Sequence, residues 1–167
     1  MKGDDLRAVQ APIKDLYRST PEAALITLKA NGRLGEGVTC KIETGKALVA
    51  AGLHPATGGN GLSACSGDML LEALVACAGV TLNAVATALG IELRDAILSA
   101  EGDLDFRGTL GVSKEAPVGF QNIRLWISLD TDATEEQRAT LIRLTERYCV
   151  VYQTLVRPPA IAVTTSS

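Results

Sequence analysis

The chain has 167 residues, of which 47% are hydrophobic and 21% are charged, and its formal net charge is −3. This length and composition predict one globular domain over residues 1–167, and the acidic balance excludes a general nucleic-acid binder, which would need a basic patch. The first residues contain no apolar signal-peptide core, and the four cysteines have no CxxC spacing. We therefore expect a cytoplasmic protein with free or reactive thiols.

The first part of the chain predicts a short amphipathic helix followed by an antiparallel meander of strands. The helix is expected over residues 4–17, with an interruption at Pro12. An Asn-Gly pair predicts a hairpin turn over residues 31–35, because Asn-Gly favours the positive φ angles of tight turns, and residues 44–46 predict another turn. Three strands are expected around these turns, at residues 24–30, 38–43 and 48–51.

A Gly-rich loop follows over residues 54–66. Such a loop before a helix can cradle phosphate, but the lysine of a Walker motif is missing after the last glycine. A loop that wraps over a close neighbour is the favoured interpretation. The lone His54 in this loop predicts no metal site, because no second histidine or CxxC accompanies it.

The stretch from Cys65 to Gly90 predicts one long helix that is apolar almost all round and therefore packed on all sides. Ser66 or Asp68 can cap its start, and Gly90 stands where a glycine commonly ends a helix. Polar residues interrupt the apolar run and no Lys/Arg cluster flanks it, so we expect a buried core helix and no membrane span.

The second half of the chain predicts two strands, a helix and a last strand. The two strands are expected over residues 96–106 and 120–130, with a loop over residues 107–119 between them. Thr134 and Gln137 form a capping-box pattern that opens a helix, which continues through Leu141, Leu144 and Tyr148. A final strand is expected over residues 161–165. The order of elements predicts an α+β fold.

Two cysteine segments carry a family resemblance. LLEALVACAGVTL around Cys77, followed far downstream by ERYCVVYQTL around Cys149, resembles the OsmC/Ohr family of thiol-dependent hydroperoxide reductases. The segments ANGRLGEG and RGTLG fall in the family's order. The resemblance implies an OsmC-like fold of antiparallel sheets around a long central cysteine-bearing helix. It also implies a cytoplasmic, intertwined homodimer with two active sites at the subunit interface.

The resemblance also assigns roles to residues. It implies that Cys77 is the peroxidatic cysteine, that Cys149 is the resolving cysteine, and that Arg33 in the early turn activates the first thiol. The glutamate that the family places ten residues before the cysteine is Gly67 here, so Asp68 or Glu72 is the candidate carboxylate. The proline that often follows the second cysteine is Val150 here.

The chemistry expected of Cys77 needs a partner. A thiol in the middle of a buried helix is expected to have a raised pKa, and the helix dipole acts only near the first turn. We therefore expect Arg33 to supply positive charge, oriented by Asp68 or Glu72. Cys65, at the loop–helix junction, is either a third reactive thiol or a structural residue, and Cys40 is expected in the core with Val38 and Ile42.

The resemblance implies thiol-dependent reduction of organic hydroperoxides, in oxidative-stress defence, with an external dithiol as reductant and no metal or organic cofactor. Cys77 would become a sulfenic acid, and Cys149 would condense with it to a disulfide. The alternative is a non-enzymatic dimer of the same fold that binds a small hydrophobic ligand or senses oxidants. Gly67 at the family's glutamate position favours this alternative.

Overall fold

A computed structural model describes residues 2–5, 8, 19, 31–34, 39–43, 48–111 and 113–165, with backbone alone for residues 31–34, 39–43, 48 and 107. The chain divides into two compact units, which are described separately below. The sheet unit contains Ala8–Glu72 and Ala100–Leu125, and the helical unit contains Met1–Arg7, Ala73–Ser99 and Trp126–Ser167. The expectation of one domain over residues 1–167 stays a prediction.

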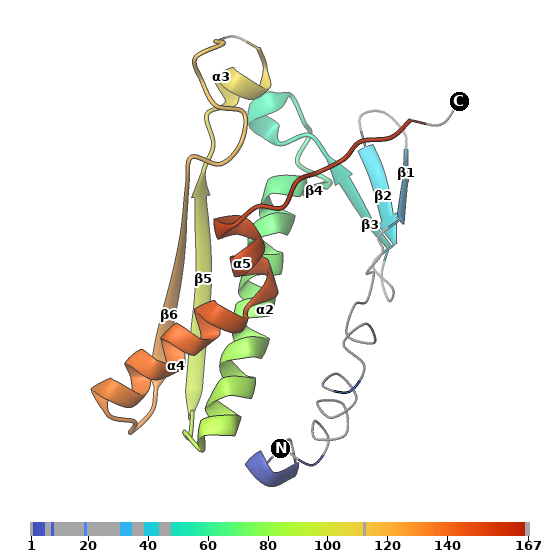
Figure 1. The fold of residues 1–167 in the computed structure, drawn as a ribbon. Coiled ribbons are helices and arrows are strands. Elements are labelled where there is room, and N and C mark those ends of the chain that lie inside the picture. Colours follow the sequence, from blue (N-terminus) through green and yellow to red (C-terminus); the bar gives the residue numbers. More distant parts are fainter. Residues whose placement is uncertain are drawn as a thin grey trace. The chain divides into compact units, whose positions relative to one another are not determined.

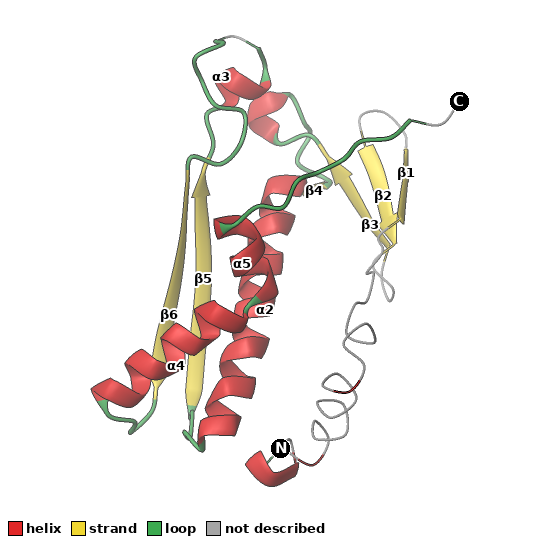
Figure 2. Ribbon diagram, in the orientation of Figure 1, coloured by secondary structure: helices red, strands yellow, loops and turns green. Residues whose placement is uncertain are grey.

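The sheet unit holds a four-stranded sheet in the order β1-β2-β3-β4 (Figure 2). Strands β1 (Asn31–Leu34), β2 (Thr39–Glu43) and β3 (Leu48–Gly52) are antiparallel neighbours, and the two-residue β4 (Ala64–Cys65) runs parallel to β3. The predicted strands at 38–43 and 48–51 are therefore confirmed. The helix expected over 4–17 lies mostly outside the described residues, and the strand at 24–30 and the turn at 44–46 lie outside them entirely.

The turn predicted over residues 31–35 is wrong for its first four residues. Asn31–Leu34 form strand β1, in which Gly32 pairs with Ile42 and Arg33 pairs with Lys41. The ladder hydrogen bonds of an antiparallel pair override the local turn preference of Asn-Gly, since strand formation depends on the neighbouring strand more than on intrinsic propensity. Arg33 is thus a strand residue.

Helix α2 (Ser66–Leu89) confirms the long helix, which begins one residue after Cys65. Its end is a Schellman motif: Gly90 has a φ of 69°, the Gly90 N–H donates to Thr87 O, and the Ile91 N–H donates to Ala86 O at 2.9 Å. The prediction that Gly90 ends the helix is confirmed.

The expectation that α2 is packed on all sides is wrong for the single chain. Its buried residues follow one stripe, Leu74, Ala78, Leu82 and Ala86, whereas Val80 is 74% exposed. A stripe at spacings of four residues covers one side of a helix, so the opposite apolar side has no partner within the described chain. By length and composition alone α2 is able to cross a membrane, a property that core helices of soluble proteins share.

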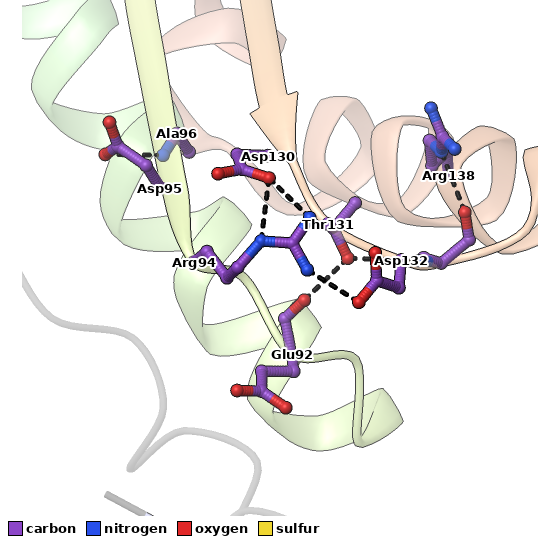
Figure 3. A network of polar contacts seen from close by, with 9 residues as sticks. Glu92, Arg94, Asp95, Ala96, Asp130, Thr131, Asp132 and Arg138 are labelled. Atoms are coloured by element: carbon purple, nitrogen blue, oxygen red, sulfur yellow. Dashed lines mark hydrogen bonds and ion pairs between the residues drawn. The ribbon is translucent and has the colours of Figure 1, made fainter.

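Strands β5 (Asp95–Asp103) and β6 (Asn122–Asp130) form a two-stranded sheet, with a short helix α3 (Phe106–Thr109) in the connection expected to be a loop. The 3-10 turn η2 (Pro55–Thr57) lies in the Gly-rich loop. At one end of the β5–β6 pair, the Arg94 guanidinium binds Asp130 and Asp132, each at 2.6 Å (Figure 3). Arg94 lowers the pKa of the Asp132 carboxyl through this hydrogen bond and its charge.

Helix α4 (Glu135–Tyr148) begins with the predicted capping box: Thr134 accepts from the Gln137 N–H, and the Gln137 side chain accepts from the Thr134 N–H. A second helix, α5 (Val150–Val156), follows after Cys149 and was not expected from the sequence. In the helical unit, Leu141 of α4 is fully buried with Leu82 and Ala86 of α2, and apolar residues of β5 and β6 pack around them. This core holds α2 and α4 together.

The strand predicted over residues 161–165 is wrong. These residues form no regular structure, and Ile161 and Val163 are 87% and 88% exposed. Apolar alternation predicts a strand only where a sheet edge accepts its hydrogen bonds, and the described chain pairs no strand with this tail.

Candidate active site

Helices α4 and α5 meet at a corner (Figure 1), and Cys149 is the single residue between them. It is the C-cap of α4, and its N–H donates to Thr145 O at 2.9 Å. It is also the N-cap of α5, where its Sγ accepts from the Tyr152 N–H at 3.5 Å. The side chain is 1% exposed. Both helices therefore fix the second thiol in a buried position.

Cys77, in the middle of α2, meets the beginning of α5. The backbone N–H groups of Val151 and Val150 and the Cys149 thiol lie close enough to its sulfur to lower the pKa of Cys77 by hydrogen bonding. The Thr81 hydroxyl, one turn further along α2, also contributes a hydrogen bond. Cys77 is partly buried, and both cysteines are free thiols. The fold thus brings together the two thiols that the sequence predicted as partners, 72 positions apart in the chain.

The two thiols are shifted in opposite directions. Burial raises the pKa of Cys77, but the hydrogen bonds from Val151, Cys149, Val150 and Thr81 outweigh it, so its pKa lies below the ordinary value. Burial raises the pKa of Cys149, and donating its proton toward Cys77 raises it further. The expectation that Cys77 has a raised pKa is therefore wrong, because the N–H groups of a distant helix stabilise its thiolate.

These shifts predict which thiol reacts first with an alkylating agent. With its pKa below the ordinary value, Cys77 is thiolate over a wider pH range than Cys149, so its alkylation should begin at lower pH. Peptide mapping by mass spectrometry after brief iodoacetamide exposure at a series of pH values measures both midpoints. Val150→Pro removes one donor while proline is tolerated in the first helical turn, and should raise the Cys77 midpoint. Equal midpoints for the two thiols would contradict the assignment.

The other predicted site residues lie in the sheet unit. Arg33 lies in β1, where the backbone alone is described, and Asp68 is an exposed residue in the first turn of α2. Within α2, nine residues separate Asp68 from Cys77, which places them about 13 Å apart along the axis and on roughly opposite faces. Glu72 is exposed as well. Asp68 thus does not share the helix face of Cys77.

Gly67, at the position of the family's glutamate, lies against apolar atoms. A Cβ at this position would lie 3.4 Å from Phe120 Cζ, 3.6 Å from Leu104 Cδ1 and 3.6 Å from Cys65 Sγ. These are ordinary van der Waals distances, so a side chain at this position would begin against two apolar side chains and a thiol. Cys65 is partly buried at the end of β4.

Sequence reasoning missed the donors that surround Cys77. Thr81 is four residues after Cys77 on the same helix face, a spacing that identifies a neighbour. The N–H groups of Val150 and Val151 carry no sequence signal, because only the tertiary packing of α5 on α2 directs them at the thiol.

No group of three metal-ligating side chains occurs among the described residues. His54 accepts from the Ala56 N–H and stacks on Phe106 at 5.0 Å.

The OsmC-like protein family profile matches residues 58–164. The chain belongs to the OsmC-like family. This match covers the cysteine helix, both thiols and the β5–β6 pair. The OsmC-like fold is a soluble fold, and α2 is its central helix, which accounts for the length and apolar composition of α2 without a membrane. No curated protein matches the chain in sequence.

Solved OsmC-like structures have the same fold. An OsmC-like protein of Mycoplasma pneumoniae superposes with a TM-score of 0.67 at 16% identity, over 80% of this chain and 89% of that one. An organic hydroperoxide resistance protein of Elizabethkingia anophelis gives 0.63 at 18% identity, over 80% and 90%. One of Legionella pneumophila gives 0.61 at 18% identity, over 80% and 91%. The α+β, OsmC-like fold expected from the sequence is confirmed.

Proposed function

We propose that this OsmC-like protein reduces organic hydroperoxides in defence against oxidative stress, with Cys77 as the attacking thiolate and Cys149 as the resolving thiol. The hydrogen-bonded thiol pair carries the proposal. Cys77 is the more acidic member and the more accessible, whereas Cys149 is buried and holds its proton. A nucleophile must be thiolate and reachable, and a resolving thiol must wait beside it. Two of the similar structures are named organic hydroperoxide resistance proteins.

The reaction needs no atom beyond the two sulfurs, the peroxide and a dithiol. Cys77 thiolate attacks one peroxide oxygen, the O–O bond breaks, and the alkoxide leaves and takes a proton to become an alcohol. Cys77 is now a sulfenic acid, and the Cys149 sulfur displaces its hydroxyl as water, forming a disulfide. An external dithiol then reduces this disulfide by two exchange steps and is itself oxidised. The Val150 and Val151 N–H groups stabilise the thiolate before attack.

Arg33 and Asp68 complete the proposed site. The family resemblance supports Arg33 as the cation that attracts the peroxide and the thiolate, and Asp68 or Glu72 as the carboxylate that orients its guanidinium. Asp68 lies on the face of α2 opposite Cys77, so its contact would be with the guanidinium and not with the thiol. All three residues belong to the sheet unit. Since backbone N–H groups already lower the pKa of Cys77, the role left to Arg33 is mainly substrate positioning.

The proposed assembly is a cytoplasmic homodimer around two copies of α2. The exposed apolar side of the helix supports it: Ala73, Ala76 and Val80 follow one another at spacings of three and four, and Val80 is 74% exposed. Covering apolar side chains on one helix face with a second copy removes them from water and lowers the free energy of the assembly. The family's intertwined dimer places such helices at its centre.

A second candidate is a non-enzymatic dimer that senses oxidants or binds a small hydrophobic ligand. The apolar surroundings of Gly67 favour it, because the family's activating glutamate has no counterpart at that position. In this case the Cys77–Cys149 pair would still oxidise, but without repeated turnover.

Steady-state consumption of cumene hydroperoxide with dithiothreitol separates the two candidates. If the protein is a peroxidase, each chain should consume many equivalents of cumene hydroperoxide, at a higher rate than it consumes hydrogen peroxide. When the dithiol is omitted, peptide maps should show a Cys77–Cys149 disulfide. One equivalent consumed per chain, with no further loss when the dithiol is added, would favour the sensor. Peroxide loss no faster than in protein-free buffer, with both thiols still reduced, would refute both thiol roles.

A further inference from the structure

Helices α4 and α5 meet at a corner (Figure 1). This corner carries a basic cleft that the thiol chemistry does not use. Its volume is about 610 Å³, which lies in the range of small-molecule sites. Both helices contribute polar side chains to it, and the main ones are Arg143, Glu146 and Arg147 of α4, Tyr152 and Gln153 of α5, and Arg157 at the α5 C-cap.

The charge of this cleft is opposite to that of the whole protein. Three guanidinium groups face a single carboxylate among its lining residues, whereas the chain has a formal net charge of −3. Positive groups gathered in a concave surface raise the local concentration of anions. The cleft therefore favours an anionic ligand.

The three arginines have no carboxylate partner among the described residues. None of them forms an ion pair with a described residue, whereas Arg94 and Arg124 each contact two carboxylates. Arg143 and Arg147 stand one turn apart on α4, where like charges repel each other. An anion between the guanidinium groups would replace this repulsion with attraction.

Hydrogen bonds hold the walls of the cleft in place. The Gln153 Nε2 donates to Glu146 O at 2.8 Å and joins α5 to α4. The Gln153 N–H donates to Cys149 O at 2.9 Å, and the Arg157 N–H donates to Gln153 O at 3.0 Å. The Arg147 guanidinium lies 5.6 Å from the centre of the Tyr148 ring. A site with fixed walls loses less conformational entropy when a ligand binds.

We propose that this cleft binds a small molecule that carries phosphate groups. Guanidinium groups bind phosphate oxygens through paired N–H donors, and three of them match a ligand with more than one negative charge. Tyr152 lines the same cleft and offers a hydroxyl group. The site is separate from the proposed peroxide chemistry and stands whether or not the protein is a peroxidase.

Isothermal titration of the full-length protein with inorganic pyrophosphate tests the site, with citrate as a carboxylate probe. We expect saturable binding of one pyrophosphate per chain that weakens as salt is raised. Arg143→Gln, Arg147→Gln and Arg157→Gln should each weaken it about tenfold or more, because a charge-assisted hydrogen bond is lost. Arg138→Gln is the matched control: it removes one charge from α4 outside the cleft and should change affinity less than about twofold.

The outcomes are distinct. No saturable pyrophosphate binding would overturn the proposal, and so would tighter binding of citrate than of pyrophosphate. Equal weakening by Arg138→Gln and the cleft variants would mean general attraction to a basic helix, and would also overturn it. Circular dichroism of each variant confirms that the fold is kept, since all four arginines are exposed.

Discussion

Replacing Cys77 with serine is expected to lower the rate of hydroperoxide consumption at least about a thousandfold, to the rate of protein-free buffer. A serine hydroxyl keeps its proton at neutral pH, so the hydrogen bonds that stabilise the Cys77 thiolate have no anion to act on. Serine is close to cysteine in size, and the fold should remain. Steady-state consumption of cumene hydroperoxide measures the loss.

Cys65→Ser and Cys149→Ser are the controls for this prediction. Cys65→Ser changes a partly buried thiol outside the pair and should retain activity. Cys149→Ser should consume two or three equivalents per chain and then stop, with Cys77 found as sulfinic or sulfonic acid by mass spectrometry, because no thiol of the chain resolves its sulfenic acid. Full activity of the Cys77→Ser variant would refute the assignment of the nucleophile.

The elements that the sequence predicted well are those set by local patterns. The long helix, its Gly90 terminus and the Thr134–Gln137 capping box each depend on residues within one or two turns. The α+β class follows from the order of such elements. These predictions succeed because they depend only on neighbouring residues and not on contacts with distant parts of the chain.

The elements predicted wrongly depend on partners far away in the chain. Asn31 and Gly32 are residues that favour a turn, yet they pair with β2 and form part of a strand. Ile161 and Val163 alternate like a strand, yet the described chain offers them no sheet edge. At Asn31 and Gly32, pairing with β2 outweighs the local turn propensity. At Ile161 and Val163, the strand propensity has no neighbouring strand to support it.

The thiol pair shows the same division between local and distant information. The family resemblance names Cys77 and Cys149, but the electrostatics of Cys77 depend on α5, which no local pattern indicated. Val150 is instructive here. A proline after Cys149 would have no N–H, so this departure from the family adds one donor to the Cys77 thiolate.

Replacing Val80 with arginine is expected to dissociate the proposed homodimer. Val80 is 74% exposed in the middle of α2, so in an isolated chain the substitution should change the free energy of unfolding by less than about 0.5 kcal/mol. If two α2 helices pack together at the dimer centre, the guanidinium would be buried without a partner. This costs about 3–5 kcal/mol, and weakens association roughly 10² to 10³-fold or more.

Light scattering of wild type and variant over a range of protein concentrations measures this difference. Ile161→Arg is the matched control, because it places the same charge at an apolar residue that is 87% exposed in the C-terminal tail, and it should leave the dimer intact. A monomeric wild type would refute the proposed homodimer, and a Val80→Arg protein as dimeric as wild type would place the subunit contact elsewhere. The exposed side of α2 would then need another partner. Helix α2 is almost wholly apolar, but only one stripe of its surface is buried within its own chain.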